Sequence, residues 1–517
     1  MLLNDGYISP EEEESLVRRS SGKQVRKQKG KVLIITGFSP MGLPQFEEMG
    51  TNLDAQLINS MSGGGTIRIS IPTIGPAVIG SYLQQQGIEV EIRDFYFDKV
   101  CAFDNDVVGI SSTFMGVENV KEIADLVREQ NPSATIVLGG PLSWSVLPLK
   151  LLHEIPNIDY IVQREGEQTF LELIGRLRNG GDLSSVKGLV FRKEGNGFET
   201  PPRPLLEQEK LCKPAWELMG IPSAKRLPIL PVETSRGCPY NCAYCSEVHY
   251  WGKPVRYRTS DSVVEELRHN AERIGITTFR FTDSCFSAPP ARSAEICDAI
   301  YEGCIKDGIQ IKWSSYARVQ NLNRNLLEKM KRSGCVALDI GVESGASSIL
   351  RRMGRNYSPE MALELARVAK DIGIIINFNV VVGFPGETKE TVQSTAEMID
   401  KAAPDTFSCF LLFLAPNTLA YANSKKYGIE GEGLCWKHST MTSKEAAEAM
   451  LIITQGVSSS TSFPGGEYVA CYLTSLGYSQ EEIRAFYRAV GKLVNGSQDE
   501  KALALVGKVI QSFEKFF

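Results

Sequence analysis

The stretch Arg236-Gly237-Cys238-Pro239-Tyr240-Asn241-Cys242-Ala243-Tyr244-Cys245-Ser246 follows closely on an apolar run, Pro228–Thr234. Its three cysteines have the spacing Cys-x3-Cys-x2-Cys. Thiolates are the usual protein ligands of [4Fe–4S] clusters, and a simple electron carrier normally supplies four of them. Three thiolates leave the fourth iron open to another ligand. The stretch therefore predicts a [4Fe–4S] cluster that is held by Cys238, Cys242 and Cys245 and has one coordination site free for chemistry.

Two other interpretations of these cysteines stay open at this point. Zinc needs a fourth ligand, which His249, four residues after Cys245, would have to supply. Alternatively the three are core residues, because free cysteine is often buried. A loop that also holds Arg236 and Asn241, together with a glycine and a proline, does not fit a buried strand. The other nine cysteines form no second Cys-x2-Cys pair, so a single cluster is expected.

Downstream of residue 227 the chain alternates between apolar strand candidates and helical stretches. The strand candidates are Pro228–Thr234, Thr278–Thr282, Gln310–Ser314, Val336–Gly341, Ile374–Gly383 and Thr406–Leu414. Helix candidates follow the first five, near residues 261–274, 291–307, 323–333, 359–371 and 388–402. Six such strands predict an open or partial (β/α) barrel, whose active site lies at the carboxyl ends of the strands.

Between residues 31 and 193 the chain shows a similar alternation. The strand candidates are Val32–Thr36, Val90–Ile92, Val107–Ser111, Thr135–Leu138 and Tyr160–Val162. Helix candidates lie near residues 74–86, 118–130, 146–153 and 167–178. This pattern predicts a doubly wound, Rossmann-like parallel sheet. Several strands end in glycine or serine, which lets a large ligand approach the backbone at the carboxyl edge of the sheet.

The remaining segments complete an α/β chain of five parts. Residues 1–30 are polar and charged and predict a flexible tail, and residues 194–226 carry five prolines and predict a linker. Beyond residue 415 the pattern is mostly helical. The expected organisation is a tail (1–30), a Rossmann-like domain (31–193), a linker (194–226), a partial barrel (227–415) and a helical carboxyl-terminal domain on the substrate side (416–517).

The cysteine stretch and the strand ends together resemble the radical S-adenosylmethionine (SAM) superfamily, and specifically its members with an amino-terminal cobalamin-binding domain. The resemblance covers roughly residues 31–415. It implies that SAM chelates the open iron and is cleaved to methionine and a 5′-deoxyadenosyl radical. Residues at matching positions are then the candidate SAM contacts. They are Tyr244, Asp283, Ser315, Arg318 and Glu343.

Four of these five contacts have an expected role from the resemblance, and Ser315 is a candidate by its position alone. Tyr244 stands where the family packs a ring near the adenine, and Asp283 stands where it contacts the SAM ammonium group. Arg318 matches a bidentate partner of the methionyl carboxylate. Glu343 opens a glycine-containing turn that resembles the nucleoside-binding turn. Taken singly, the carboxylates would be solvated or helix-capping groups and the arginine a surface cation.

The first domain resembles the cobalamin-binding Rossmann-like domain. The candidate cobalamin contacts are Gly37, Ser111, Ser112, Gly139, Gly140, Glu165 and Gly166. One departure is informative, because the Asp-x-His-x-x-Gly motif that supplies a cobalt ligand elsewhere is missing. The only histidine of the domain, His153, lies in a helix candidate, so we expect no protein histidine on cobalt. The alternatives are a domain that has kept the fold without the vitamin or that binds another nucleotide.

The resemblance implies methylation of an unactivated carbon, or of phosphorus, in a small-molecule or natural-product substrate. The deoxyadenosyl radical removes a hydrogen atom, methylcobalamin donates the methyl group, and a second SAM remethylates the cobalt. A non-methylating rearrangement, cyclisation or dehydrogenation is the alternative within this architecture. A non-catalytic cluster-binding sensor is the alternative from another class. The sequence does not identify the substrate or any catalytic residue beyond the cofactor contacts.

Composition excludes several other classes of function. The net charge is −5, and no basic cluster lies beyond the first 31 residues, which argues against a nucleic-acid groove. No window reaches the roughly 20 apolar residues of a membrane helix, and the first residues lack the features of a secretory signal. We therefore expect a cytoplasmic protein. The resemblance to radical SAM enzymes further implies an electron donor such as a flavodoxin or a ferredoxin.

Overall fold

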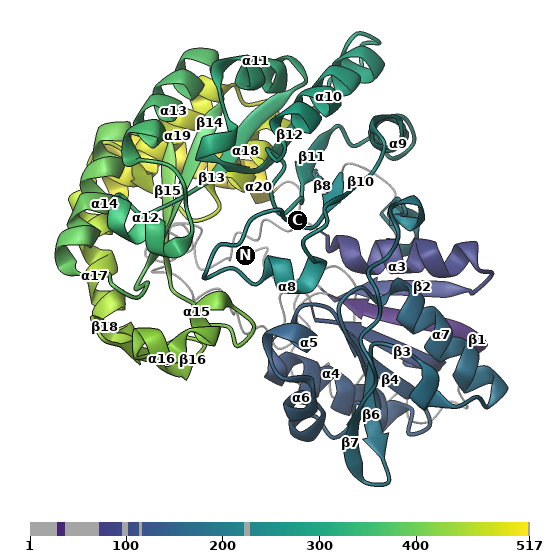
Figure 1. Ribbon diagram of the computed structural model, residues 1–517. Helices are drawn as coiled ribbons and strands as arrows, with labels where there is room; N and C mark the ends of the chain where they lie inside the picture. The colour runs from purple at the N-terminus through teal and green to yellow at the C-terminus, as the bar shows by residue number, and fades with distance from the viewer. Residues whose placement is uncertain (1–27, 37–71, 96–101, 113–115, 222–227, 515–517) are drawn as a thin grey trace. The chain divides into compact units, whose positions relative to one another are not determined.

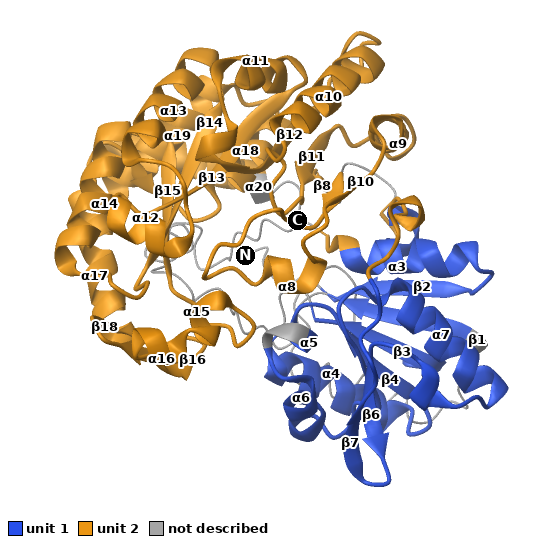
Figure 2. Ribbon diagram, in the orientation of Figure 1, with its two compact units in different colours: residues 1–43, 75–204, 214–219 blue, residues 44–74, 205–213, 220–517 orange. Residues whose placement is uncertain are grey.

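The computed structural model describes residues 28–36, 72–95, 102–112, 116–221 and 228–514. The chain divides into two compact units (Figure 2). Unit 1 comprises residues 1–43, 75–204 and 214–219, and unit 2 comprises residues 44–74, 205–213 and 220–517. None of the described helices is long and apolar enough to cross a bilayer.

Unit 1 is built on a seven-stranded sheet with the order β2-β1-β3-β4-β5-β6-β7. Strands β1 to β5 are parallel, whereas β6 and β7 are antiparallel. The strands are β1 (Gln28–Thr36), β2 (Val90–Asp94), β3 (Asn105–Ser111), β4 (Thr135–Gly139), β5 (Tyr160–Val162), β6 (Leu189–Lys193) and β7 (Asn196–Glu199). The helices are α3 (Ile74–Gln85), α4 (Val117–Gln130), α5 (Leu142–Ser145), α6 (Pro148–Glu154) and α7 (Gly166–Asn179). In this strand order the topological switch lies between β1 and β3, where doubly wound sheets bind ligands.

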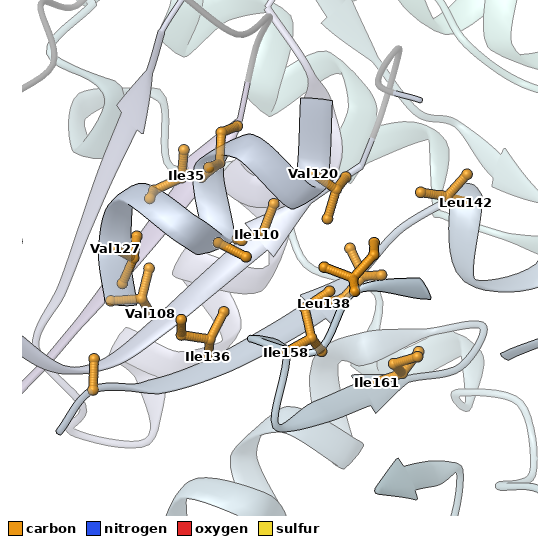
Figure 3. Close-up of a cluster of buried hydrophobic side chains, with 14 of the residues drawn as sticks. Ile35, Val108, Ile110, Val120, Val127, Ile136, Leu138, Leu142, Ile158 and Ile161 are labelled. Carbon is orange, nitrogen blue, oxygen red and sulfur yellow. The ribbon is translucent and has the colours of Figure 1, made fainter. Parts of the chain in front are cut away.

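A cluster of buried aliphatic side chains packs helix α4 and its neighbours against one face of this sheet (Figure 3). Val120 and Val127 are seven residues apart on α4 and so share one face of the helix. Val108 and Ile110 alternate along β3 and therefore point to the same side of the sheet. Burying one such side chain contributes about 1.5–3 kcal/mol. The packing fixes the strand register, so the carboxyl ends of the strands meet at one edge.

Unit 2 contains a second, fully parallel sheet with the order β19-β15-β14-β13-β12-β11-β8. The strands are β8 (Leu230–Val232), β11 (Thr278–Phe281), β12 (Lys312–Arg318), β13 (Cys335–Glu343), β14 (Ile375–Val382), β15 (Thr406–Leu411) and β19 (Thr461–Ser462). The helices between them are α9 (Ser260–His269), α10 (Pro290–Ile300), α11 (Arg324–Arg332), α12 (Ser347–Met353), α13 (Pro359–Ile372) and α14 (Lys389–Ala402). Helices α10, α11, α13 and α14 lie outside the curved row of strands (Figure 1), which is the arrangement of a partial (β/α) barrel.

The carboxyl-terminal region contributes both helices and strands to unit 2. Its helices are α15 (Leu419–Ala422), α16 (Ser424–Tyr427), α17 (Ser443–Gly456), α18 (Gly466–Ser475), α19 (Gln480–Val494) and α20 (Glu500–Glu514). A three-stranded antiparallel sheet is formed by β16 (Glu430–Glu432), β17 (Cys435–His438) and β18 (Met441–Thr442). Helix α18 packs against β11, β12, β13 and β14. Its Glu467 contacts Arg280, which lies on the inner face of the barrel sheet.

The predicted α/β architecture and every predicted strand are confirmed, but three features differ from the expectation. The predicted linker contains β7, which pairs with β6, and its residues are divided between the two units. The carboxyl-terminal region adds β19 to the barrel sheet, so that sheet has seven strands rather than six. The region beyond residue 415, predicted to be mostly helical, also contains strands, and Trp436 and His438 belong to one of them, β17. The strands that the sequence analysis missed, β6 included, are two to five residues long, which is too short to show a clear period of two in the sequence.

Candidate active site

The cysteine loop begins at the short strand β9 (Ser235–Arg236), which pairs with β10 (Arg256–Tyr257). Gly237 turns the chain into the loop with a φ of +103°, a conformation that favours glycine. A Cβ at this position would lie 2.9 Å from the carbonyl oxygen of Pro254. The glycine therefore lets the loop cross directly over the segment that precedes β10.

The loop is also held against the end of helix α12. The backbone N–H of Ala243 donates to the carbonyl oxygen of Met353 at 2.9 Å. A Cβ added at Gly354 would lie 3.0 Å from the carbonyl oxygen of Asn241. The loop that carries the cysteines is thus fixed by contacts from a helix more than a hundred residues further along the chain.

The three cysteines of the loop are free thiols close to one another. Cys238 and Cys242 are each 8% exposed, and Cys245 is half-buried. The backbone N–H of Cys245 donates to the carbonyl oxygen of Cys242 at 3.1 Å, which closes a turn between them. Burial raises the pKa of the Cys238 and Cys245 thiols, so binding of a metal must displace protons.

Among the described residues, no three histidine, cysteine, aspartate or glutamate side chains surround a single point as one metal ion requires. Zinc needs a fourth ligand around one centre, which the three-cysteine motif by itself does not supply. A cubane instead spreads its thiolates over different irons, and so it matches three cysteines that share a loop without converging. The three-cysteine loop therefore fits a [4Fe–4S] cluster better than a mononuclear ion.

Asp283, just past the end of β11, braces the segment that leads into the loop. Its carboxylate accepts hydrogen bonds from the Thr234 backbone N–H at 3.3 Å and hydroxyl at 2.8 Å, and also from the Ser235 hydroxyl. Its side chain is buried, and burial raises the pKa of this carboxyl group. The two carboxylate oxygens of Asp283 thus orient Thr234 and Ser235, which lie just before the first cysteine of the motif.

Glu343 and Tyr244 are brought together by an arginine that the sequence analysis did not single out. Arg355 donates through Nη2 to the Tyr244 hydroxyl at 2.6 Å, and the same Nη2 forms an ion pair with Glu343. Arg355 is 5% exposed, and its Nε and Nη1 have no hydrogen-bond partner among the described residues. Glu343 has a φ of +54°, which is unusual for a residue with a side chain and typical of functional sites. The arginine therefore has two buried donors available for a ligand.

Arg318, at the carboxyl end of β12, also reaches the loop. Its Nη1 donates to Cys242 Sγ at 2.9 Å, and its guanidinium lies 3.7 Å from the centre of the Tyr240 ring. Ser315 is on the same strand, three residues before Arg318, so its side chain points to the opposite face of the sheet. In the strand register Ser315 pairs with Phe281 of β11. Its buried hydroxyl makes no hydrogen bond to the described residues. The structure therefore brings Arg318 to the cysteines and does not bring Ser315 there.

Cys285 lies next to the cluster loop, in a small buried group with Cys238 and Ala288. Cys297 and Cys304, seven residues apart, are buried on α10 and in the helical turn after it, as expected of core residues. Cys101 lies outside the described residues.

In unit 1 the candidate cobalamin contacts line the carboxyl ends of β3 and β4. Ser112 joins the two strands, because its hydroxyl donates to the Gly139 carbonyl oxygen at 2.8 Å and accepts from the Leu142 N–H at 3.0 Å. Ser111 is the last residue of β3. A Cβ at Gly139 would meet no described atom within 4 Å, whereas one at Gly140, whose φ is +88°, would lie 3.1 Å from Ser112. Among the described residues, nothing fills the space beside Gly139.

The other candidates of unit 1 lie at the start of helix α7 or outside the described residues. Glu165 is the N-cap residue of α7 and Gly166 is its first residue, and both are buried. Gly37 lies outside the described residues. His153 is exposed in the last turn of α6. Sequence reasoning had no signal for Arg355, since its partners are distant in the chain.

Comparison with known proteins supports this assignment of the two units. The family model of the radical SAM superfamily matches residues 232–399, and that of the B12 binding domain matches residues 63–174. An uncharacterized methyltransferase, PH0819, of Pyrococcus horikoshii is 30% identical over 341 residues, which cover 64% of this chain and 73% of that protein. The anaerobic magnesium-protoporphyrin IX monomethyl ester cyclase of Rubrivivax gelatinosus is 27% identical, over 67% of this chain and 65% of its own length.

A solved structure has the same architecture along the chain. The radical SAM methyltransferase TsrM of Kitasatospora setae, with cobalamin and a [4Fe–4S] cluster bound, aligns with a TM-score of 0.63 and 18% identity, covering 94% of this chain and 99% of that one. At this identity the likeness shows the fold. The fold and the cysteine loop define a radical SAM enzyme with a B12-binding domain. The chain belongs to the family of cobalamin-dependent radical SAM methyltransferases.

The residues present fit the cofactors of this family, which are a [4Fe–4S] cluster, SAM and cobalamin. Three neighbouring thiols in one loop suit a cluster whose last iron binds SAM. The two unpartnered N–H groups of Arg355 suit an oxygen-bearing ligand beside that cluster. The small residues Gly139 and Gly140 at the end of β4 suit the close approach of a large ligand on unit 1.

Proposed function

We propose that this enzyme methylates an unactivated carbon, or phosphorus, of a small-molecule substrate. When bound, the cofactors supply a carbon-centred radical from SAM and a methyl donor on cobalt. The observation that carries the proposal is the three-cysteine loop in a chain that also has a B12-binding domain, because the first provides radical chemistry and the second a methyl carrier.

The contribution of the polypeptide is to bind and orient these cofactors. Cys238, Cys242 and Cys245 hold the cluster. Tyr244, Glu343 and Arg355 form a connected group beside the loop, and Asp283 fixes the approach to the first cysteine. We infer that this group binds SAM, with the unpartnered donors of Arg355 on SAM oxygen atoms. Ser111, Ser112, Gly139, Gly140, Glu165 and Gly166 are proposed to contact cobalamin, and Gly37 stays a prediction.

The proposed methylation is tested with anaerobically reconstituted holoenzyme, SAM carrying a CD3 methyl group, a strong reductant and a metabolite extract. A methyl transferase of this kind should form 5′-deoxyadenosine and S-adenosylhomocysteine in equal amounts, together with a product that carries the CD3 label. Deoxyadenosine and a new product without either S-adenosylhomocysteine or label would indicate a non-methylating radical reaction. If neither nucleoside product formed, the remaining alternative would be a non-catalytic cluster-binding sensor.

A specific observation supports the cyclisation alternative as a second candidate. Similar proteins include the Rubrivivax gelatinosus cyclase, whose name describes ring formation and which aligns with 67% of this chain. The label experiment separates the two functions, because a cyclisation transfers no methyl group. We prefer methylation because the relative with the higher identity is named a methyltransferase.

We infer that the enzyme acts in the cytoplasm and receives single electrons from a small donor protein such as a flavodoxin or a ferredoxin. The thiolates that hold a [4Fe–4S] cluster are kept reduced in the cytosol. Titration of the reconstituted enzyme with a reduced flavodoxin tests the second part. Deoxyadenosine formation without a chemical reductant is the expected result.

The proposed SAM site predicts a large loss of SAM affinity in two variants. Arg355→Met and Glu343→Gln each remove a charge from a buried, hydrogen-bonded group, and losing one such contact costs about 1.5–3 kcal/mol, or about ten- to a hundredfold in affinity. The cluster should still assemble, because its three cysteines are retained. Equilibrium dialysis with labelled SAM measures the change. Arg351→Met, an exposed arginine on α12, is the matched control and should bind SAM as the wild type does.

The cobalamin site predicts a cobalt without a protein histidine. His153 is exposed on α6 and is the only histidine of residues 31–193. Electron paramagnetic resonance (EPR) of the bound cob(II)alamin should therefore lack the three-line splitting of an axial nitrogen. If the splitting appears and is lost in His153→Ala, the assignment is wrong. An unchanged spectrum in that variant is the expected control.

A further inference from the structure

All three nitrogen atoms of the Arg318 guanidinium donate hydrogen bonds. Nη1 donates to Cys242 Sγ at 2.9 Å. With its amide oriented to satisfy both partners, Gln320 accepts from Nη2 at 2.9 Å and from Nε at 3.1 Å. Arg318 is 6% exposed, so this charged group is almost fully withdrawn from water. Its contacts leave little capacity for a further bidentate partner.

The position of Arg318 is fixed from three further directions. Its guanidinium stacks at 3.7 Å on the ring of Tyr240, which belongs to the cysteine loop. The Tyr240 hydroxyl donates to Asn321 Oδ1 at 2.7 Å, and the Arg318 backbone N–H donates to the Ser287 hydroxyl at 3.0 Å. Because the loop and the end of β12 are connected through both Tyr240 and Cys242, the guanidinium cannot leave the sulfur without breaking several contacts.

Arg318 and Arg355 therefore differ in what they offer. Arg355 keeps two buried donors without a described partner, whereas Arg318 directs a donor to a sulfur of the proposed cluster. We propose that Arg318 is a positioning residue of the cluster, which donates a hydrogen bond and a positive charge to the Cys242 sulfur and thereby raises the reduction potential of the cluster. This proposal rests on the proposed function only in requiring that the cluster is bound.

The direction of the effect follows from electrostatics. Reduction moves one electron from a low-potential donor protein, which is oxidised, to the cluster, with no bond made or broken. The added negative charge is stabilised by a nearby cation and by a hydrogen bond to sulfur, both of which raise the potentials of iron–sulfur clusters. Because the site is buried, water screens this interaction only weakly. The arginine thus makes the cluster easier to reduce.

The test is a potentiometric titration of the SAM-free, reconstituted full-length protein followed by EPR of the reduced cluster. Arg318→Met should assemble a cluster with wild-type iron content, but its midpoint should shift to a more negative value by about 59 mV. That shift corresponds to about a tenfold change in the reduction equilibrium for one electron. Arg318→Lys, which keeps the charge, should recover part of the shift. Arg324→Met, an exposed arginine paired with Asp371, is the matched control and should leave the midpoint unchanged.

A midpoint and EPR spectrum of Arg318→Met equal to those of the wild type would overturn the proposal. If that variant holds no cluster, Gln320→Leu decides, since Gln320 is a partly exposed residue that fixes the guanidinium without touching the cysteines. A negative shift in Gln320→Leu supports the proposal, and an unchanged midpoint contradicts it. Neither measurement involves methyl transfer, so a failure of the methylation experiment is distinguishable from a failure here.

Discussion

Replacing Cys238, Cys242 and Cys245 together by alanine is expected to reduce the iron content of the reconstituted protein from about four atoms per chain, the content of one cubane, to none. SAM cleavage should be lost with the iron, because the cleavage needs an electron from the cluster. Iron and sulfide analysis, the absorbance of the cluster and the yield of 5′-deoxyadenosine measure the change. A wild-type protein that bound eight irons in a defined ratio would contradict the single-cluster reading.

Two single variants serve as controls for the cysteine experiment. Cys435 is exposed on β17, and Cys435→Ala should keep four irons. Cys285→Ala removes the buried thiol that packs beside Cys238 without belonging to the spaced motif. It should also keep four irons, since three thiolates and SAM complete the coordination. Loss of iron in Cys285→Ala alone would show that the motif does not define the whole ligand set.

Arg280→Met is expected to lower the free energy of unfolding of unit 2 by about 3–5 kcal/mol, the cost of leaving a buried charge without its partner. Arg280 is 0% exposed, and its Nη2 lies 3.6 Å from Asp339 and 3.5 Å from Glu467. The rings of Tyr316 and Tyr468 lie 4.1 and 4.7 Å from its guanidinium carbon. Because Glu467 and Tyr468 belong to α18, the variant also loosens this helix from the barrel. Urea unfolding followed by tryptophan fluorescence measures the shift.

The loss in Arg280→Met should depend on pH in a defined direction. Burial raises the pKa of Glu467, with a further contribution from Asp339, and burial raises the pKa of Asp339. Without Arg280, protonation of Asp339 stabilises the folded state. In the unfolded chain the pKa of this carboxyl group is about 3.9. The folded state then binds more protons than the unfolded state above that value, so stability falls as the pH rises. The deficit should be larger at pH 8 than at pH 5.5.

Two further variants check this explanation of the Arg280 result. Adding Asp339→Asn to Arg280→Met removes the unpaired carboxylate and should restore part of the stability, as expected for two groups in direct contact. Arg332→Met removes an exposed arginine that pairs with Asp298, and surface pairs of this kind contribute about 0–1 kcal/mol. If Arg332→Met were as destabilising as Arg280→Met, burial of the charge would not be the cause.

The amino-acid sequence by itself predicted the cysteine motif as the cluster site, and it determined the parallel strands of both sheets and the class of the enzyme. The cysteine spacing is a local property of eight residues, and strands such as β13 and β14 are long enough to show their apolar pattern without any tertiary context. The ends of the strands followed from the same apolar pattern. For this reason Asp283, Arg318 and Glu343 were predicted at the carboxyl edge of the barrel sheet, where they lie. Local periodicity and spacing depend only on near neighbours in the chain.

Only the tertiary structure decided which side chains meet around the cysteines. Arg355 joins Tyr244 and Glu343, and Glu467 of α18 reaches Arg280 on β11, although nothing in the local sequence marks either arginine. Side chains alternate between the two faces along β12, so Ser315 points away from the face that carries Arg318. The strand predicted from the sequence ended at residue 314 and could not show this. Ion pairs between distant segments form only once packing has fixed the strand register and the helix positions. The roles of the arginines therefore depend on long-range geometry that the sequence pattern does not encode locally.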